Sequence, residues 1–202
     1  MTISIPNLFF SNSSQTLGVR GAAILLAVVH AKEKTMFQSI AVANEFIAIS
    51  LAKNNAVTPM KLLKLVYFAH GWHLGIYDRP LIDEQVEAWK YGPVVDSIYH
   101  EVKSYGTNKI NSLIERTRFT NSELITEVPR IDLGDPNGDR ALALIKRVWK
   151  VYSPHTGIKL SNMTHQTGTP WFKVWNAMDF PIKGTDIPEV MIKDHFSELA
   201  RG

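Results

Sequence analysis

The chain has 202 residues, of which 45% are hydrophobic and 20% are charged, and it contains no cysteine. A chain of this size buries enough apolar surface to fold without a disulfide or a structural metal ion, and its ordinary apolar fraction excludes a disordered protein. The lack of cysteine excludes disulfide scaffolds, zinc ribbons and cysteine nucleophiles. These properties predict a soluble globular protein with one domain and an extension.

Most of the net charge of +3 lies in the first 35 residues, which hold three basic residues and one acidic residue. A nucleic-acid-binding protein usually carries a basic stripe on its folded domain, so we do not expect nucleic acid as a partner. The apolar run 21–29 is too short to span a bilayer. We predict a cytoplasmic protein without membrane association, in which residues 1–35 are an extension outside the functional domain of residues 36–202. A hydrophobic anchor and a short packing helix are the alternatives for this extension.

The apolar periodicity and the chain breakers predict a mainly helical, compact domain with a buried central helix and at most one small pair of strands. In chain order, the patterns predict helices over 37–53, 59–74, 94–105, 139–152, 157–165 and 188–199, a strand or extended connection over 81–91, and an irregular stretch over 106–138 with a short helix near 110–114.

Two of these helices carry the clearest signals. The segment 62–69 (LLKLVYFA) is apolar except at Lys64, which predicts the helix at the centre of the core. Thr58 and Pro59 precede it as N-cap and first helical residue. In the helix over 139–152, Asp139 is the expected N-cap. Its expected buried face consists of Leu144, Ile145, Val148, Trp149 and Tyr152.

Familiar catalytic and metal-binding signatures are absent from the sequence. His100 begins an H-E-x-x-H pattern, but Ser104 stands where the second histidine would be needed. No phosphate-binding loop and no G-x-S-x-G nucleophile motif is present. His70 and His73 lie three residues apart and would supply half a metal site, but this helix carries no acidic residue. We interpret both as core histidines and predict neither a metal nor a cofactor.

Two motifs carry the remaining functional signal. In the first, Thr164 and His165 precede Pro170 and Trp171. They form either the centre of a hydrolase-type enzyme, with His165 as general base, or a structural corner in which they satisfy backbone groups beside Trp171. We favour the corner, because a general base needs a nucleophile within reach and the sequence does not show one.

The second motif is the segment 88–94 (AWKYGPV). Trp89, Lys90 and Tyr91 place large amphipathic side chains just before a Gly92–Pro93 turn, and such residues dominate protein–protein binding. Alternatively, Trp89 and Tyr91 alternate, so that one ring packs inward and the other covers the core. Both interpretations hold together if one ring anchors the fold and the other faces a partner.

The segments 62–69, 88–94 and 160–165, followed by Pro170–Trp171, resemble in this order the Panacea (SocA-like) antitoxin domain, a family also labelled phage-associated protein of the GepA type. The resemblance runs from about Phe37 to about Met178. It implies a non-enzymatic antitoxin of a bacterial toxin–antitoxin pair or mobile element, which binds a cognate protein toxin encoded next to it.

The resemblance also implies an alternative, in which the protein delivers its bound toxin to a cytosolic protease. The family supplies no catalytic residues. As partner-binding or motif residues, the resemblance transfers Trp89, Lys90, Tyr91, Gly92, Pro93, Thr164, His165, Pro170 and Trp171. A DNA-binding regulator is a further alternative, for which a small basic face on the helix over 139–152 is the best candidate. Such a face is more often solvated surface.

Overall fold

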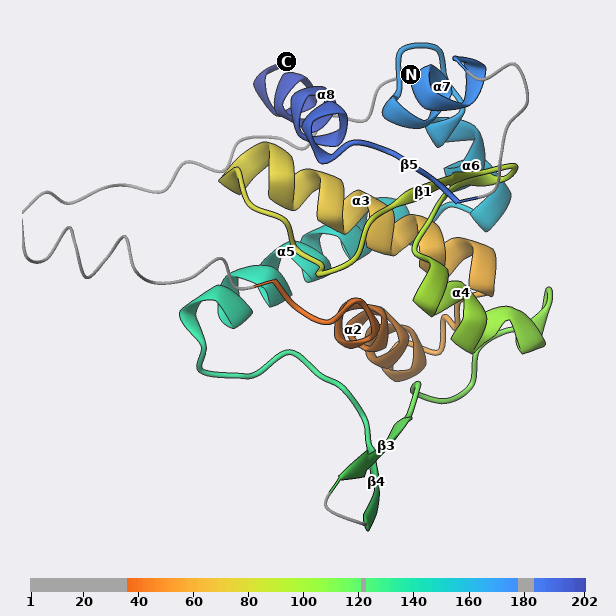
Figure 1. The fold of residues 1–202 in the computed structure, drawn as a ribbon, viewed down its shortest axis with the longest axis vertical. Coiled ribbons are helices and arrows are strands. Elements are labelled where there is room, and N and C mark those ends of the chain that lie inside the picture. Colours follow the sequence, from red (N-terminus) through yellow and green to blue (C-terminus); the bar gives the residue numbers. More distant parts are fainter. Residues whose placement is uncertain (1–35, 121–122, 178–183) are drawn as a thin grey trace, which may run out of the picture.

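The computed structural model describes residues 36–120, 123–177 and 184–202, so the predicted extension lies outside the described residues. Within these ranges the mainly helical fold is confirmed, with short antiparallel strands added to it (Figure 1). The elements in chain order are α2 (Ser39–Ala52), α3 (Pro59–Tyr77), β1 (Glu87–Trp89), β2 (Gly92–Val94), α4 (Asp96–Val102), the 3-10 helix η1 (Lys103–Tyr105), β3 (Arg116–Thr120), β4 (Glu123–Glu127), α5 (Pro136–Tyr152), α6 (Gly157–Thr164), α7 (Pro170–Asn176), β5 (Thr185–Asp186) and α8 (Glu189–Arg201).

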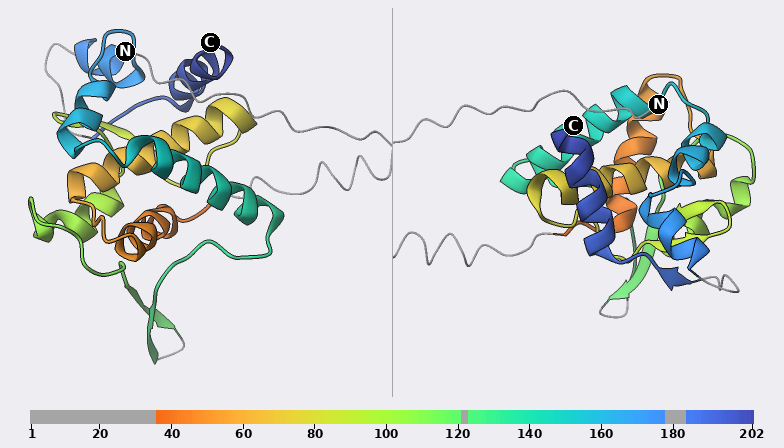
Figure 2. Two further views of the ribbon diagram at one scale, coloured as in Figure 1. Left: turned by 180° about the vertical axis from the view of Figure 1, so that it is seen from behind. Right: turned by 90° about the horizontal axis from the view of Figure 1, so that it is seen from above.

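Helix α3 is the centre of the core, as the apolar segment 62–69 predicts. It is buried from Leu62 to Leu74, and α2, α5, α6 and α8 pack around it (Figures 1 and 2). Phe68 stacks on Tyr152 of α5 with a centroid distance of 4.3 Å. The Trp72 indole N–H donates to the Tyr152 hydroxyl at 3.0 Å, so the largest side chain of α3 is buried with its polar atom satisfied.

The amphipathic helix α5 shows the five buried positions that the sequence predicts, but it begins earlier than expected. Asp135, not Asp139, is its N-cap, and the Asp135 carboxylate accepts a hydrogen bond from the backbone N–H of Asn137 at 2.8 Å. Pro136 then occupies the first helical position, where its missing N–H costs nothing. The cap and the proline together move the start of the helix upstream of Asp139, which lies inside its first turn.

The strand content exceeds the one pair that the sequence predicts. The expected strand within 81–91 is β1, which pairs with β2 on one side and β5 on the other, all antiparallel. Strands β3 and β4 form a separate hairpin. The helix expected near 110–114 is wrong, because Ile110 and Ile114 donate their backbone N–H groups to Val57 and Asn44 instead. Helix α7 was not expected.

None of the described helices combines the length and the apolar character that crossing a bilayer requires.

Candidate functional site

The turn that joins β1 to β2 is fastened to three helices through its own backbone. Every second carbonyl from residue 89 to residue 93 accepts a hydrogen bond from a side chain of a different helix. The three bonds, each 2.8 Å long, run from Trp171 Nε1 of α7 to Trp89 O, from Ser161 Oγ of α6 to Tyr91 O and from Lys64 Nζ of α3 to Pro93 O. The turn therefore has one fixed position relative to the body of the domain.

Gly92 allows this close approach. Its backbone has φ +101°, a conformation that L side chains rarely adopt. A Cβ atom at this position would lie 2.7 Å from Thr164 Oγ1 and 2.9 Å from Lys64 Cε. Both the backbone angle and the available space thus require glycine here, which explains why the motif contains Gly92 directly before Pro93.

Lys64 is the residue of this site that the sequence-based search for functional residues passed over. Its side chain is 1% exposed, and no described acidic residue forms an ion pair with it. Burial lowers the pKa of Lys64 to about 7, because removal from water disfavours the charged ammonium. One feature of the sequence could have indicated it: Lys64 is the one polar residue in the apolar segment LLKLVYFA. A lysine buried in such a segment needs a hydrogen-bond partner.

The side chains at the tip of the turn point in different directions. Tyr91 is 61% exposed, and the Lys90 ammonium lies 5.6 Å from the centre of its ring. Trp89 is half-buried: its ring packs edge-on against Tyr99 of α4 at 4.7 Å, and its N–H donates to a Glu87 carboxylate oxygen at 2.6 Å. One ring is thus packed on the domain and the other faces solvent.

The segment 164–171 forms a corner that supports this turn. The Thr164 hydroxyl donates to the Ser161 carbonyl at 2.7 Å, and the Thr164 carbonyl accepts from the Thr169 hydroxyl at 2.6 Å. His165 stacks on Trp171 with a centroid distance of 3.8 Å. Pro170 is the first residue of α7, which places the Trp171 indole under the turn. Thr164 thus bonds to backbone groups as expected of a structural corner, whereas the His165 side chain contributes a ring stack.

His165 retains one feature that a catalytic role would need. Its Nε2 atom is buried and has no hydrogen-bond partner among the described residues. Burial, followed by the nearby Lys64 charge, lowers the pKa of His165, so the ring is neutral at neutral pH. The imidazole stacks on Trp171, and its Nε2 atom is hydrogen-bonded to no hydroxyl of the described residues.

A groove of about 730 Å³ lies beside the turn. Most of its lining is apolar or aromatic and two lysines contribute, while none of the lining residues that the structure describes is acidic. The lining residues are Pro59, Met60, Leu63, Lys64, Trp89, Lys90, Tyr91, Val94, Tyr99, Gly106 and Trp175. Its volume lies in the range of about 300–1,000 Å³ that is typical of ligand-binding clefts. The predicted motif residues 89–91 thus form one wall of an apolar groove.

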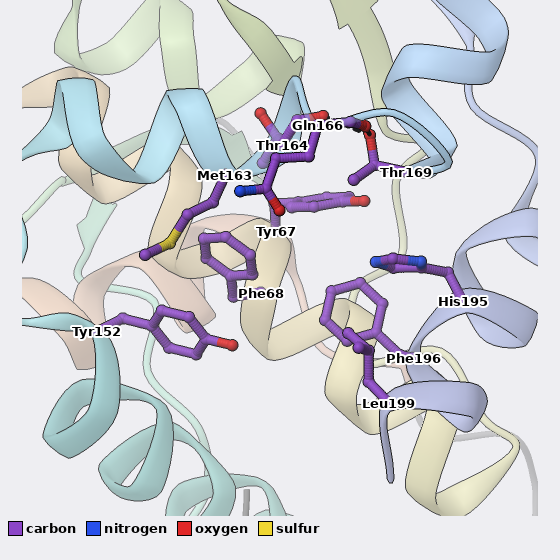
Figure 3. A pocket seen from close by; sticks show the side chains of 10 residues that line it. All are labelled: Tyr67, Phe68, Tyr152, Met163, Thr164, Gln166, Thr169, His195, Phe196 and Leu199. Carbon is purple, nitrogen blue, oxygen red and sulfur yellow. Dashed lines mark hydrogen bonds between the residues drawn. The ribbon is translucent and has the colours of Figure 1, made fainter. Parts of the chain in front are cut away.

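A second cavity lies on the other side of the corner, between α3, the end of α6 and α8 (Figure 3). Its volume is about 80 Å³, and the rings of Tyr67, Phe68 and Phe196 face into it. This space holds a few water molecules at most, since one water occupies about 30 Å³ in the liquid. We therefore assign it to imperfect packing between α3 and α8.

The two histidines considered as half of a metal site lie in the core. His70 is 1% exposed and its Nδ1 accepts from the Leu81 N–H at 3.4 Å, while His73 Nδ1 donates to the Arg79 carbonyl at 2.6 Å. Burial lowers the pKa of His70 to about 3. In the described ranges, no three histidine or acidic residues are grouped in a way that could hold a metal ion.

Comparison with known proteins identifies the family. Residues 62–172 match the family model described as antitoxin SocA-like, Panacea domain. Antitoxin SocA of Caulobacter vibrioides (strain NA1000 / CB15N) is 31% identical over 158 residues, which cover 77% of this chain and 80% of the relative. No solved structure matches the chain significantly. The matched range contains the β1–β2 turn, the corner and the helix that supports both, and the chain belongs to the SocA-like antitoxin family with the Panacea domain.

Proposed function

We propose that this protein neutralises a cognate protein toxin by binding it directly, with the β1–β2 turn and the adjoining groove as the contact surface. The observation that carries this proposal is the fastening of three alternate carbonyls of the turn to α3, α6 and α7. A loop that is fixed before binding loses little conformational entropy when a partner docks on it. Family membership supports the antitoxin role.

The chemistry of the surface favours a protein partner. Tyr91 presents a large amphipathic ring to solvent at the rim of the groove, and Lys90 lies beside it. Tyrosine buries much area and immobilises only two side-chain torsions, which makes it a frequent binding hot spot. Because the described lining of the groove contains lysines and no acidic side chain, a toxin surface that combines apolar or aromatic side chains with a carboxylate complements it.

We further propose that the protein acts without catalysis and that Thr164, His165, Pro170 and Trp171 are supporting residues. Their hydrogen bonds and ring stack hold the corner, and the corner holds the Trp89 carbonyl. Under this proposal, His165→Ala lowers the melting temperature through the lost stack. An enzyme centred on His165 would instead lose its activity and keep its stability.

The test is co-expression of the neighbouring reading frame with this protein, followed by copurification and measurement of Kd. The wild type is expected to rescue growth and to form a stable complex. Tyr91→Ala is expected to weaken this complex by about 2 kcal/mol at an unchanged melting temperature, because the ring is exposed in the free protein. Val190→Ala on α8 is the matched control, since Val190 is 58% exposed and lies outside the groove.

Toxin abundance in the same cells separates direct neutralisation from delivery to a protease. Direct neutralisation leaves the toxin level unchanged in the rescued cells, whereas delivery lowers it and requires an active protease. Rescue without a detectable complex, or equal affinities for wild type and Tyr91→Ala, would contradict the proposed contact surface.

A further inference from the structure

The β3–β4 hairpin projects from the domain as an arm (Figure 1), and Figure 2 shows the same projection from two other sides. All described residues of the two strands are exposed except Thr120 and Glu127, which are half-exposed. In the described part of the chain no further strand pairs with either outer edge. An isolated two-stranded hairpin is marginally stable in water. The arm therefore needs contacts with the domain that hold it, and its exposure calls for a functional explanation.

The structural cause is a clamp at the base of the arm, formed by two buried polar residues of α2. The Asn44 side chain donates to the carbonyls of Ile114 and Pro129, at 2.9 and 3.0 Å, and accepts from the Ile114 N–H at 2.8 Å. Glu45 accepts two hydrogen bonds from the Arg130 guanidinium, at 2.7 and 2.9 Å. Residues 114 and 129–130 flank the two strands, so α2 holds the chain both where it enters the arm and where it leaves it.

The two faces of the arm differ in character. In the antiparallel register, Phe119 lies opposite Leu124 and Thr117 lies opposite Thr126. Since directly paired residues share a face and alternate along the strand, these four form one uncharged face. On the opposite face, Arg118 donates to a Glu127 carboxylate oxygen at 3.0 Å, and Glu123 adds a further charge, so that face is charged.

The uncharged face exposes more apolar surface than a free arm needs. Phe119 is 74% exposed and Leu124 is 72% exposed, and they form one contiguous pair. A pair of this size is smaller than the patches of several hundred Å² that mark an interface by themselves, so it suits a contact that adds to a larger one. Charged side chains are well solvated, so the charged face can remain in water. The Phe119–Leu124 face is then the side that a partner covers.

The size of this face argues against a second copy of the chain as the occupant. Five residues of an antiparallel strand span about 17 Å, and two strands span about 10 Å, so one face offers about 170 Å². A stable dimer usually buries about 800 Å² on each partner. The arm alone therefore cannot hold two copies together, but it can add to a larger contact made elsewhere on the molecule.

Helix α4 connects the arm with the proposed toxin-binding groove. Tyr99 of α4 lines the groove, while Glu101, two residues later, forms an ion pair with Arg116 at the start of β3, at 3.4 Å. Gly106 also lines the groove, and the segment 107–115 leads directly from it to the arm. Residues two apart do not face the same side of a helix, so α4 lies between the groove and the arm. A protein seated in the groove therefore reaches the arm by extending across α4.

We infer that the arm is a second contact for the toxin held at the groove, with Phe119 and Leu124 inserted into an apolar notch on the toxin surface. This inference rests on the proposed function. The groove supplies the larger part of the binding area, and the arm adds a contact that only a toxin with a suitable notch can satisfy. The arm then acts as a determinant of which toxin the protein accepts.

The test measures the Kd of the full chain for the toxin with the double substitution Phe119→Ser and Leu124→Ser. Removing two interface apolar side chains is expected to weaken binding by about 30-fold or more. Ile125→Ser is the matched control: it lies on the charged face of the same strand as Leu124, and its Kd is expected to stay within about twofold of the wild type. Unchanged melting temperatures verify that each variant is folded.

A second variant replaces residues 116–127 by a short glycine-containing link and keeps the clamp at Ile114 and Pro129. It is expected to lose the same affinity as the double variant while still binding through the groove. Equal Kd values for the wild type and both arm variants, with Tyr91→Ala still impaired, would overturn the arm contact and leave the proposed function standing. Absence of toxin binding by the wild type itself would overturn both. Light scattering that shows a wild-type dimer, lost in the arm variants at unchanged toxin affinity, would also overturn the inference in favour of self-association.

Discussion

The two hairpins of this protein differ in a way that their lengths do not explain. β1 and β2 have three residues each, yet their turn is fixed by a third strand and by side chains from three helices. β3 and β4 have five residues each, and their described links to the domain, the Asn44 clamp and the Arg116–Glu101 ion pair, lie at the base of the arm. The shorter hairpin is thus the more firmly held one. Tertiary hydrogen bonds, more than strand length, decide how rigidly a small hairpin is presented.

Both hairpins nevertheless share one device, a buried polar side chain on a core helix that binds their backbone. Lys64 of α3 donates to the β1–β2 turn, and Asn44 of α2 binds both legs of the β3–β4 arm. Burying a polar group is costly unless it is hydrogen-bonded. Lys64 and Asn44 are both hydrogen-bonded in this way, and each lies where a core helix holds a hairpin.

The largest expected effect comes from breaking the clamp of the arm. Asn44→Ala removes three hydrogen bonds and leaves buried backbone groups at Ile114 and Pro129 without their partner. We expect the free energy of unfolding to fall by about 4 kcal/mol, measured by chemical denaturation. Asn108→Ala at an exposed position should change it by less than about 0.5 kcal/mol. A loss of unfolding free energy in Asn44→Ala no larger than that in Asn108→Ala would contradict the role of the clamp.

The next effect comes from the fastened turn. Gly92→Ala combines an unfavourable backbone angle with a Cβ contact of 2.7 Å to Thr164 Oγ1. The expected loss of stability is about 3 kcal/mol, with weaker toxin binding because the turn moves. Gly106→Ala is the matched control for packing, since Gly106 also has a backbone that favours glycine (φ +57°, ψ −112°) but has open space around it. It should lose only the backbone part of the effect, about 2 kcal/mol. Equal melting temperatures for both variants would contradict the close packing of the turn.

The smallest effect is a change of stability with pH. It distinguishes Lys64 from Asn44, because only the lysine side chain gains or loses a proton. Its pKa is about 7 in the folded protein, against the ordinary lysine value of 10.5, so the unfolded chain binds more protons than the folded protein between these limits. Stability therefore rises with pH over this window, by at most about 1.4 kcal/mol per pH unit from this group. Lys64→Met should flatten the rise and Asn44→Ala should leave it unchanged, as measured by urea unfolding between pH 7 and 9. The same slope in Lys64→Met would assign the effect to another group.

Several features of the fold were predictable because local patterns carry them. The apolar run 62–69 identified the central helix, and the spacing from Leu144 to Tyr152 identified the buried face of α5. The breakers around Gly92–Pro93 and Pro170 marked the two ends of the site. The start of α5 was misplaced, because Asp135–Pro136 and Asp139 offer competing helix starts and periodicity does not choose between them.

The sequence by itself determined which segments are apolar, where they are interrupted, and that Trp89 and Tyr91 stand beside a stiff turn. Only the tertiary structure decided which atoms hold that turn, because its hydrogen bonds join residues 29, 70 and 82 positions apart. Such pairings leave no periodicity in the chain. The same reason explains the wrong helix near 110–114: Asn44 binds Ile114 across 70 residues, and that long-range bond replaced the local pattern with the base of an arm.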